Sequence, residues 1–320
     1  MTIVLIFPIV LYTGPVHSQA APYPPAANLV LPPGTSRIPF LWKADSVNAK
    51  WEPHTAMLIP VKLKHCPALF FMQFDLGSPY SVLYKNKLAA IQAQYPAAIS
   101  LQENAGSLLN FSFRAGAVPV LANEIAVKQF DSSALDWNNK KSMEVIGTIG
   151  ADLIDGKTVI IDYPGRQLII SAAIPAKRMK GLTLSSFIYA GKKILLPAKV
   201  QGKETLLYFD TGSSMYELLT DKTTCLSLAL PGSEFVQSRV RSWDKYLTAN
   251  SIAANGSIET GGKTIPIQYA TFIEGTSTAQ VEQMKKTGIG GMTGNKIFLN
   301  YKLVIDTKNK KFGLIGSRNF

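Results

Sequence analysis

Two short segments of the sequence each place an aspartate, a glycine and a serine at the end of a run of strand-forming residues. They are Phe74–Ser78 (FDLGS) and Phe209–Ser213 (FDTGS). One such segment would be ordinary turn chemistry, because these residue types favour turns. Two copies indicate a pair of carboxyl groups. Two carboxyls held close together share one proton, and such a pair supplies a general acid and a general base at once.

The similarity between the two halves extends well beyond these segments. Leu58–Leu63 matches Leu195–Val200, and Val118–Val120 more weakly matches Ile265–Ile267. The block that begins at Gly147 aligns without a gap with the block that begins at Gly291. A long repeat that occurs only twice predicts two similar lobes rather than a solenoid.

The residue types and their arrangement in short runs favour strands over helices. The chain has 320 residues, of which 47% are hydrophobic and 17% charged, so it is large and apolar enough for two folded lobes. Valine, isoleucine, threonine and aromatic residues occur in short runs separated by glycine, proline, asparagine and aspartate, as in β-proteins. We predict an all-β fold in which a hairpin precedes each aspartate. Helices are expected at about Val82–Gln94 and in a shorter stretch after Asp210.

These patterns divide the chain into four parts. We expect a signal peptide at residues 1–20 and a Pro-rich arm at 21–50. An N-terminal lobe with Asp75 would follow at 51–180, and a C-terminal lobe with Asp210 at 181–320.

The two segments and the glycine-containing block that follows each of them resemble the pepsin-like and retropepsin-like aspartic proteases. Phe209–Ser213 matches the family motif fully, whereas Phe74–Ser78 departs from it at Leu76, where the family carries threonine or serine. The resemblance implies a cleft between the lobes with catalytic Asp75 and Asp210 on its floor. It also implies an extended peptide as substrate, no cofactor, and a flap within residues 101–110.

The neighbours of each aspartate have expected supporting roles. Gly77 and Gly212 allow a tight turn beneath the carboxylates. Ser78 and Ser213 donate hydrogen bonds to the outer carboxylate oxygens. In this family a hydroxyl beside each aspartate bonds across to the opposite loop, which Thr211 can do and Leu76 cannot. We therefore consider two functions: an exported aspartic endopeptidase, and a catalytically weak or inactive protease-like protein that binds peptides.

Other kinds of site have less support in the sequence. The net charge of +12 suits an anionic surface such as a cell envelope. The lysines are scattered and no recognition-helix or aromatic-basic motif occurs, so no nucleic acid is expected. The histidines and cysteines lack metal-ligand spacing. Cys66 and Cys225 occupy unrelated positions in the two halves, which favours two separate thiols over a disulfide. Asp162 and Asp306 are interpreted as turn residues, and Gly261–Thr264 as a hairpin turn.

The N-terminus predicts export. Ile3–Leu11 is apolar but too short to span a bilayer, and small residues follow it near Ser18 and Ala20. We expect a monomeric, secreted or periplasmic protein without stable membrane insertion. Mass spectrometry of protein from its native compartment should find a chain that starts near Gln19 or Ala21. An intact Met1 on a cytoplasmic protein would contradict export.

Overall fold

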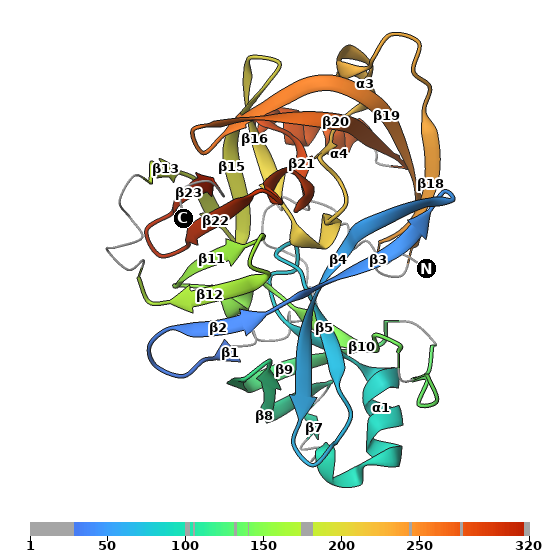
Figure 1. Ribbon diagram of the computed structural model, residues 1–320, viewed down its shortest axis with the longest axis vertical. Coiled ribbons are helices and arrows are strands. Elements are labelled where there is room, and N and C mark those ends of the chain that lie inside the picture. Colours follow the sequence, from blue (N-terminus) through green and yellow to red (C-terminus); the bar gives the residue numbers. More distant parts are fainter. Residues whose placement is uncertain are drawn as a thin grey trace, which may run out of the picture.

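The computed structural model describes residues 29–99, 103–104, 106–130, 133–139, 141–173, 182–242, 245–275 and 278–316. The N-terminal lobe, at the bottom of Figure 1, is built on one large sheet. In spatial order its strands are β1 (Leu29–Val30), β9 (Val118–Lys128), β6 (Val82–Tyr84), β10 (Val145–Ile149), β5 (Phe70–Phe74), β4 (Lys50–Leu63), β8 (Ser107–Ala115) and β7 (Glu103–Asn104), and β3 (Leu41–Val47) also pairs with β4.

The C-terminal lobe repeats this plan at the top of Figure 1. Its strands in spatial order are β14 (Ile188–Ala190), β15 (Lys193–Val200), β16 (Lys203–Phe209), β21 (Ile289–Thr293), β17 (Leu218–Leu219), β20 (Lys263–Glu274), β19 (Lys245–Thr260) and β18 (Val236–Ser242). The helices are α1 (Lys85–Gln94), α3 (Lys222–Leu228) and α4 (Thr278–Lys286), with short 3-10 helices η1 (Pro96–Ala98), η2 (Ala151–Leu153), η3 (Thr211–Ser213) and η4 (Lys296–Phe298).

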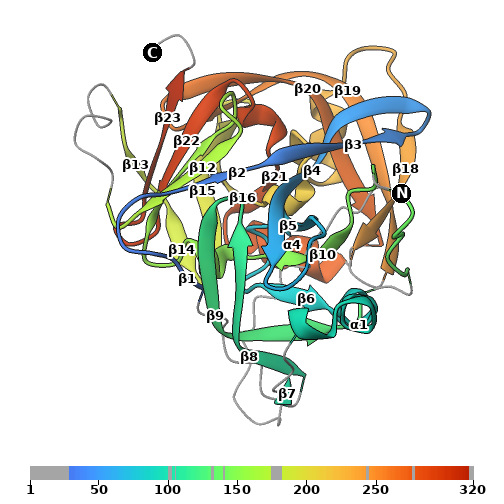
Figure 2. The same ribbon diagram turned by 60° about the horizontal axis from the view of Figure 1, so that its bottom comes forward.

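A central sheet joins the lobes, and Figure 2 shows strands of both halves side by side in it. Its order is β13 (Ser185–Ser186), β23 (Lys311–Gly316), β22 (Tyr301–Asp306), β11 (Thr158–Asp162), β12 (Gln167–Ser171) and β2 (Ser36–Pro39). The repeat in the sequence aligns Ile160 with Val304, and these two residues are direct register partners in the antiparallel β11–β22 pair. The approximate twofold axis between the halves therefore passes through this pair.

These observations confirm the all-β, two-lobed prediction, and several local expectations also hold. The hairpins β4–β5 and β15–β16 lead into Asp75 and Asp210. Asp162 and Asp306 each accept a backbone N–H three residues later, at 2.9 Å, as turn residues do. Cys66 and Cys225 are separate, buried thiols.

Two expectations about local structure need correction. Much of the proposed arm at residues 21–50 belongs to the sheets, because β1 pairs with β9, β2 with β12 and β3 with β4. Pro39 is compatible with this because β2 is an edge strand. The expected helix at Val82–Gln94 starts only at Lys85, since β6 pairs with strands on both sides. The predicted signal peptide lies outside the described residues.

The β3–β4 hairpin is a second connection between the lobes. In Figure 1 it crosses the molecule diagonally and reaches β18, where Asn48 Nδ2 donates to the carbonyl of Gln237. Farther along, Lys296 Nζ lies 2.8 Å from Glu52 Oε2. Burial alone would raise the pKa of Glu52, but hydrogen bonds from His54 and Lys296 lower it to about 2. The ion pair thus persists at acidic pH and holds the hairpin on the C-terminal lobe.

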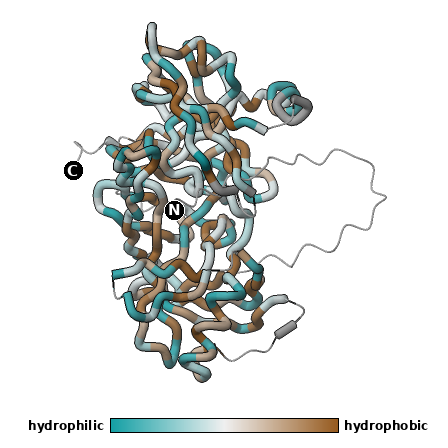
Figure 3. The backbone as a smooth tube through the Cα atoms, turned by 90° about the vertical axis from the view of Figure 1, so that its right-hand side faces the viewer, coloured by the Kyte–Doolittle hydropathy of each residue, from teal (hydrophilic) through white to brown (hydrophobic). Residues whose placement is uncertain are grey.

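The hydrophobic core is continuous between the lobes. Buried apolar residues of both halves, including Ile59, Phe74, Phe209 and Phe298, form one cluster. Figure 3 shows hydrophobic segments within each lobe. Among the described residues, no helix is both long and apolar enough to cross a membrane.

Candidate active site

Each aspartate is held at the end of a strand by a parallel neighbour. Strand β10 runs beside β5, and β21 runs beside β16, with the same geometry in both lobes. The amide of Asp75 donates to Ile149 O at 2.9 Å, and that of Asp210 donates to Thr293 O at 3.0 Å. The repeated strand pairs therefore bring the two aspartates of the sequence motif to equivalent places.

The two carboxyl groups meet between the lobes. Gly77 N donates to Asp75 Oδ1 at 2.8 Å and to Asp210 Oδ1 at 3.1 Å, so one amide hydrogen lies between the two carboxylates. Both aspartate side chains are 0% exposed. The structure thus brings together the residues that the sequence singled out, and it buries them completely in this conformation.

Glycine is required at positions 77 and 212 because the opposite carboxylate lies close to the backbone there. The backbone at these positions is not in the left-handed conformation that favours glycine. Neither Gly77 nor Gly212 has a positive φ. A Cβ atom at Gly77 would lie 2.4 Å from Asp210 Oδ1, and one at Gly212 would lie 2.6 Å from Asp75 Oδ1. Each glycine therefore makes room for the opposite carboxylate. The expected tight turns are also present, since Ser78 N donates to Asp75 O and Ser213 N to Asp210 O, each at 3.2 Å.

The two carboxylates have unequal surroundings. Asp210 Oδ1 accepts from Gly212 N at 2.7 Å, and its Oδ2 accepts from Ser213 Oγ at 2.8 Å. Asp75 Oδ1 accepts from Gly77 N and, at 3.2 Å, from Ser78 N. Asp75 Oδ2 is buried and accepts no hydrogen bond from the described residues. The expectation for Ser78 is wrong, because its hydroxyl donates to Tyr80 O at 2.7 Å instead of to Asp75.

The unequal hydrogen bonding of Asp75 and Asp210 affects which of the two is more easily protonated. Burial raises the pKa of Asp75 well above its ordinary value, and the nearby charge of Asp210 raises it further. Burial also raises the pKa of Asp210, but hydrogen bonds from Asp75, Ser213 and Gly212 counteract this. The donors gathered around Asp210 favour its charged form, whereas Asp75 Oδ2 accepts no hydrogen bond from the described residues that would favour a charge there. The unequal hydrogen bonding therefore favours a proton on Asp75 over one on Asp210.

The hydrogen bonds expected from a hydroxyl beside each aspartate to the opposite loop, here called the cross-lobe clamp, are formed on one side only. Thr211 Oγ1 accepts from Leu76 N at 2.8 Å and donates to Phe74 O at 2.9 Å, as expected for Thr211. The side chain of Leu76 is fully buried in the main core and returns no hydrogen bond. Apolar packing therefore replaces one half of the clamp.

Sequence reasoning missed three polar residues beside the aspartates. Tyr208 OH donates to Gly77 O at 3.0 Å, and Asn295 Nδ2 donates to Thr211 O at 3.0 Å. Tyr163 OH donates to Asn295 Oδ1 at 2.8 Å. Their positions gave a weak signal: Tyr208 lies two residues before Asp210, and Asn295 directly follows the repeated Gly294.

The hairpin expected to be the flap is short. Strands β7 and β8 pair at two positions, Glu103 with Leu108 and Asn104 with Ser107, and Gly106 O accepts from Val127 N at 2.8 Å. This turn is therefore bonded to β9 of its own sheet. In the C-terminal lobe, β18 and β19 pair over the longer run from Val236–Ser251 to Ser242–Lys245.

The β18–β19 hairpin packs beside the loop that carries Asp210. Val240 of β18 and Ala249 of β19 form a buried cluster with Tyr208, Tyr216 and Met292. Met292 Sδ lies 3.3 Å from Ser213 Oγ, which bonds to Asp210. The β18–β19 hairpin thus packs against residues that surround the C-terminal aspartate.

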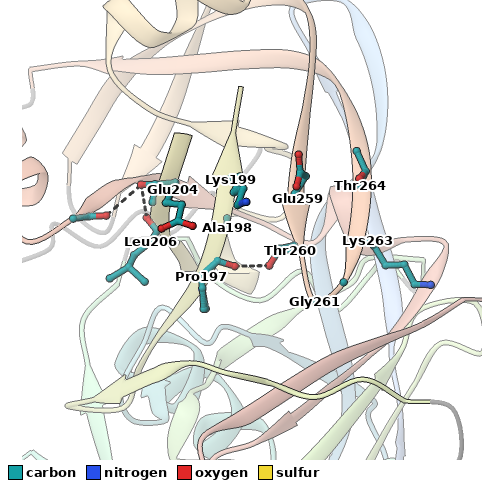
Figure 4. Close-up of a pocket in the computed structure, with 13 residues that line it drawn as sticks. Pro197, Ala198, Lys199, Glu204, Leu206, Glu259, Thr260, Gly261, Lys263 and Thr264 are labelled. Carbon is teal, nitrogen blue, oxygen red and sulfur yellow. Dashed lines mark hydrogen bonds between the residues drawn. The ribbon is translucent and has the colours of Figure 1, made fainter. Parts of the chain in front are cut away.

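A separate hollow of about 760 Å³ lies on the flank of the C-terminal lobe (Figure 4). Its charged lining residues are Lys199, Glu204, Glu259 and Lys263, and neither Asp75 nor Asp210 borders it. Thr260 Oγ1 donates to Pro197 O across its wall, so these polar atoms bond to each other. Within the described part of the chain, no group of three or more His, Cys, Asp or Glu side chains is placed to bind a metal ion.

The chain is similar in structure to a known protein but matches none by sequence. No family model matches the chain, and no curated protein matches it by sequence. Among solved structures, the aspartic proteinase from Irpex lacteus is similar, with a TM-score of 0.48 and 11% identity. The match covers 88% of this chain and 97% of that one.

The burial of the pair predicts a pH-dependent stability. Because the native pKa of Asp75 is raised above its unfolded value, the folded protein keeps a proton that the unfolded chain releases. This contribution to stability is complete below about pH 4 and declines as the pH rises through the raised native pKa. Asp75→Asn should reduce the decline, and the part that remains comes from Asp210, whose pKa is also raised by burial. Urea unfolding between pH 4 and 7.5 would measure it, and equal pH slopes in the two proteins would contradict the assignment.

Proposed function

We propose that this chain is an exported aspartic-type endopeptidase that cleaves peptides bound in an extended conformation. The observation that carries the proposal is the amide of Gly77, which donates to both carboxylates and thereby holds them within reach of one water molecule. Supporting features are the burial of the pair and its unequal hydrogen bonding. Neither a metal nor a cofactor enters the proposed reaction.

The asymmetry gives each aspartate a role. Asp210, charged and held by Ser213 and Gly212, accepts a proton from the attacking water. Protonated Asp75 donates its proton to the oxygen of the scissile carbonyl. Water oxygen and carbonyl carbon form a bond, which gives a neutral tetrahedral diol. When the C–N bond breaks, the proton on Asp210 goes to the leaving nitrogen, and Asp75 recovers a proton from the diol.

Substrate binding requires a change from the described conformation, since both carboxyls are fully buried. We propose that the β18–β19 hairpin moves away from Tyr208 and Tyr216 when a peptide enters. The hairpin packs there through the short side chains of Val240 and Ala249. The motion would let water and the scissile bond reach the carboxyl pair.

The two aspartates should be individually essential. Asp75→Asn and Asp210→Asn keep the shape of the side chain but remove the acid or the base, so each should abolish cleavage. The purified mature proteins would be incubated with a diverse peptide pool from acidic to neutral pH, and products identified by mass spectrometry. Full activity in either variant would refute the catalytic pair.

The same experiment tests the competing function. Leu76, which leaves the cross-lobe hydrogen bonding one-sided, favours a protein that binds peptides without cleaving them. Peptide binding by the wild type with no cleavage at any pH would support that function. The Asn variants also control for contaminating proteases, because they are purified in the same way.

The two serines should differ in their effect on rate. Ser213→Ala removes a hydrogen bond to charged Asp210 and should lower kcat roughly tenfold or more. Ser78→Ala removes a bond to Tyr80 O, so it should cost about 1 kcal/mol of stability and leave kcat nearly unchanged. Steady-state kinetics and thermal unfolding of both variants would measure this. Equal losses of kcat would contradict the asymmetric pair.

A further inference from the structure

The loop that carries Asp210 receives no hydrogen bond from the side chain of Leu76. In the other direction, Thr211 Oγ1 bonds to Leu76 N and to Phe74 O and so fixes the loop that carries Asp75. Carboxylate placement within a fraction of an ångström matters for rate. Some other contact must therefore position the Asp210 loop relative to the N-terminal lobe.

Tyr163 provides such a contact from the N-terminal lobe. It follows β11 directly, and its hydroxyl donates to Asn295 Oδ1 at 2.8 Å. Asn295 Nδ2 in turn donates to Thr211 O and to Ser214 Oγ, both at 3.0 Å, on either side of Gly212 and Ser213. Tyr163 and Asn295 are 2% and 0% exposed. A chain of buried hydrogen bonds thus leads from one lobe into the catalytic loop of the other.

The direction of the Tyr163 hydroxyl is fixed by packing. Its ring is stacked against Trp42 of the N-terminal lobe at 6.2 Å and against Phe298 of the C-terminal lobe at 6.4 Å. Ring contacts with both lobes limit rotation of the side chain. The hydroxyl therefore reaches Asn295 from a preorganised position.

Tyr208 provides the opposite contact. It lies on β16 of the C-terminal lobe, two residues before Asp210, and its hydroxyl donates to Gly77 O of the N-terminal catalytic loop at 3.0 Å. The amide of the same Gly77 bridges the two carboxylates. Tyr208 is fully buried beneath the β18–β19 hairpin. Its hydrogen bond thus acts on the residue that brings the carboxylates together.

We infer that Tyr163 and Tyr208 are positioning residues for the catalytic pair and together replace the cross-lobe hydroxyl that is missing at Leu76. The inference rests on the proposed function. Burial raises the pKa of both phenols, so they remain protonated hydrogen-bond donors throughout the working pH range.

The repeat supports this assignment. By sequence alignment, Gln73 occupies the place of Tyr208 in the first half, and Thr307 occupies the place of Tyr163 in the second half. Thr307 Oγ1 bonds to the carbonyls of Ile154 and Lys157, not to the motif around Asp75. Neither tyrosine therefore has an equivalent in the other half of the repeat. The same is true of the Thr211 hydroxyl, which faces Leu76.

The test compares three variants that each lose one hydroxyl. Tyr163→Phe and Tyr208→Phe remove the two proposed contacts. Tyr189→Phe is the matched control, because Tyr189 OH also bonds between the lobes, to Asp155 Oδ1 at 3.1 Å, but away from both catalytic loops. Tyr163→Phe and Tyr208→Phe should each lower kcat about fivefold, the rate equivalent of one neutral hydrogen bond, with KM unchanged within about twofold. Tyr189→Phe should leave both constants unchanged.

Two further variants separate positioning from general stability. Leu76→Thr added to Tyr163→Phe should recover the lost rate, since it returns a hydroxyl to the empty side of the clamp. Asn295→Ala interrupts the Tyr163 chain at its second member and should reproduce the loss if Tyr163→Phe does not fold. Reduced thermal stability with unchanged kcat in the phenylalanine variants, or equal losses in all three, would overturn the inference.

The failure of the proposed function would be visible separately. If the wild type and every variant cleave nothing, the carboxyl titration of Asp75 and Asp210 is followed by ¹³C NMR. A change in the apparent pKa values in Tyr163→Phe and Tyr208→Phe, absent in Tyr189→Phe, would keep the positioning role in a protein without peptidase activity. Unchanged titration in all variants would overturn it.

Discussion

The placement of two carboxyl groups side by side in the interior is the constraint on which the rest of the structure depends. Two buried negative charges repel each other strongly, so one carboxyl must keep a proton and the other must be stabilised by donors. The chain meets this requirement with backbone amides, above all that of Gly77, which donates to both aspartates. Glycine at positions 77 and 212 is what allows the loops to approach so closely.

The twofold arrangement of the lobes brings these loops together, but the two halves have diverged. The β11–β22 pair lies on the axis and sets the relation between the lobes. Around it, Thr211 faces Leu76, Ser213 bonds to its aspartate while Ser78 does not, and β18–β19 is longer than β7–β8. The difference between the serines favours charge on Asp210 and a proton on Asp75. Asymmetry of this kind suits a reaction in which one group accepts a proton while the other donates one.

Contacts between the lobes do more than close the interface. The β3–β4 hairpin reaches across through Asn48 and Glu52, and the ring of Trp42 on the same hairpin supports Tyr163. Tyr163 and Asn295 then extend the connection to Thr211. The loop that carries Asp210 is thus connected to the β3–β4 hairpin, which lies far from it in the sequence. Part of this hairpin falls within the arm predicted at residues 21–50.

The repeat by itself determined the two-lobed β-fold, the hairpins before Asp75 and Asp210, and the equivalence of Ile160 with Val304, because these follow from local strand patterns copied twice. The one-sided clamp was also predictable, since leucine has no hydroxyl. Tertiary structure alone decided that Ser78 turns to Tyr80 O, that the glycines accommodate the opposite carboxylate, and that Tyr163 and Tyr208 bond across the interface. Apart from the Ser78 contact, these contacts join residues more than 130 positions apart in the sequence and depend on how two loops meet. Sequence pattern carries no information on such distances, because they arise only when the lobes pack against each other.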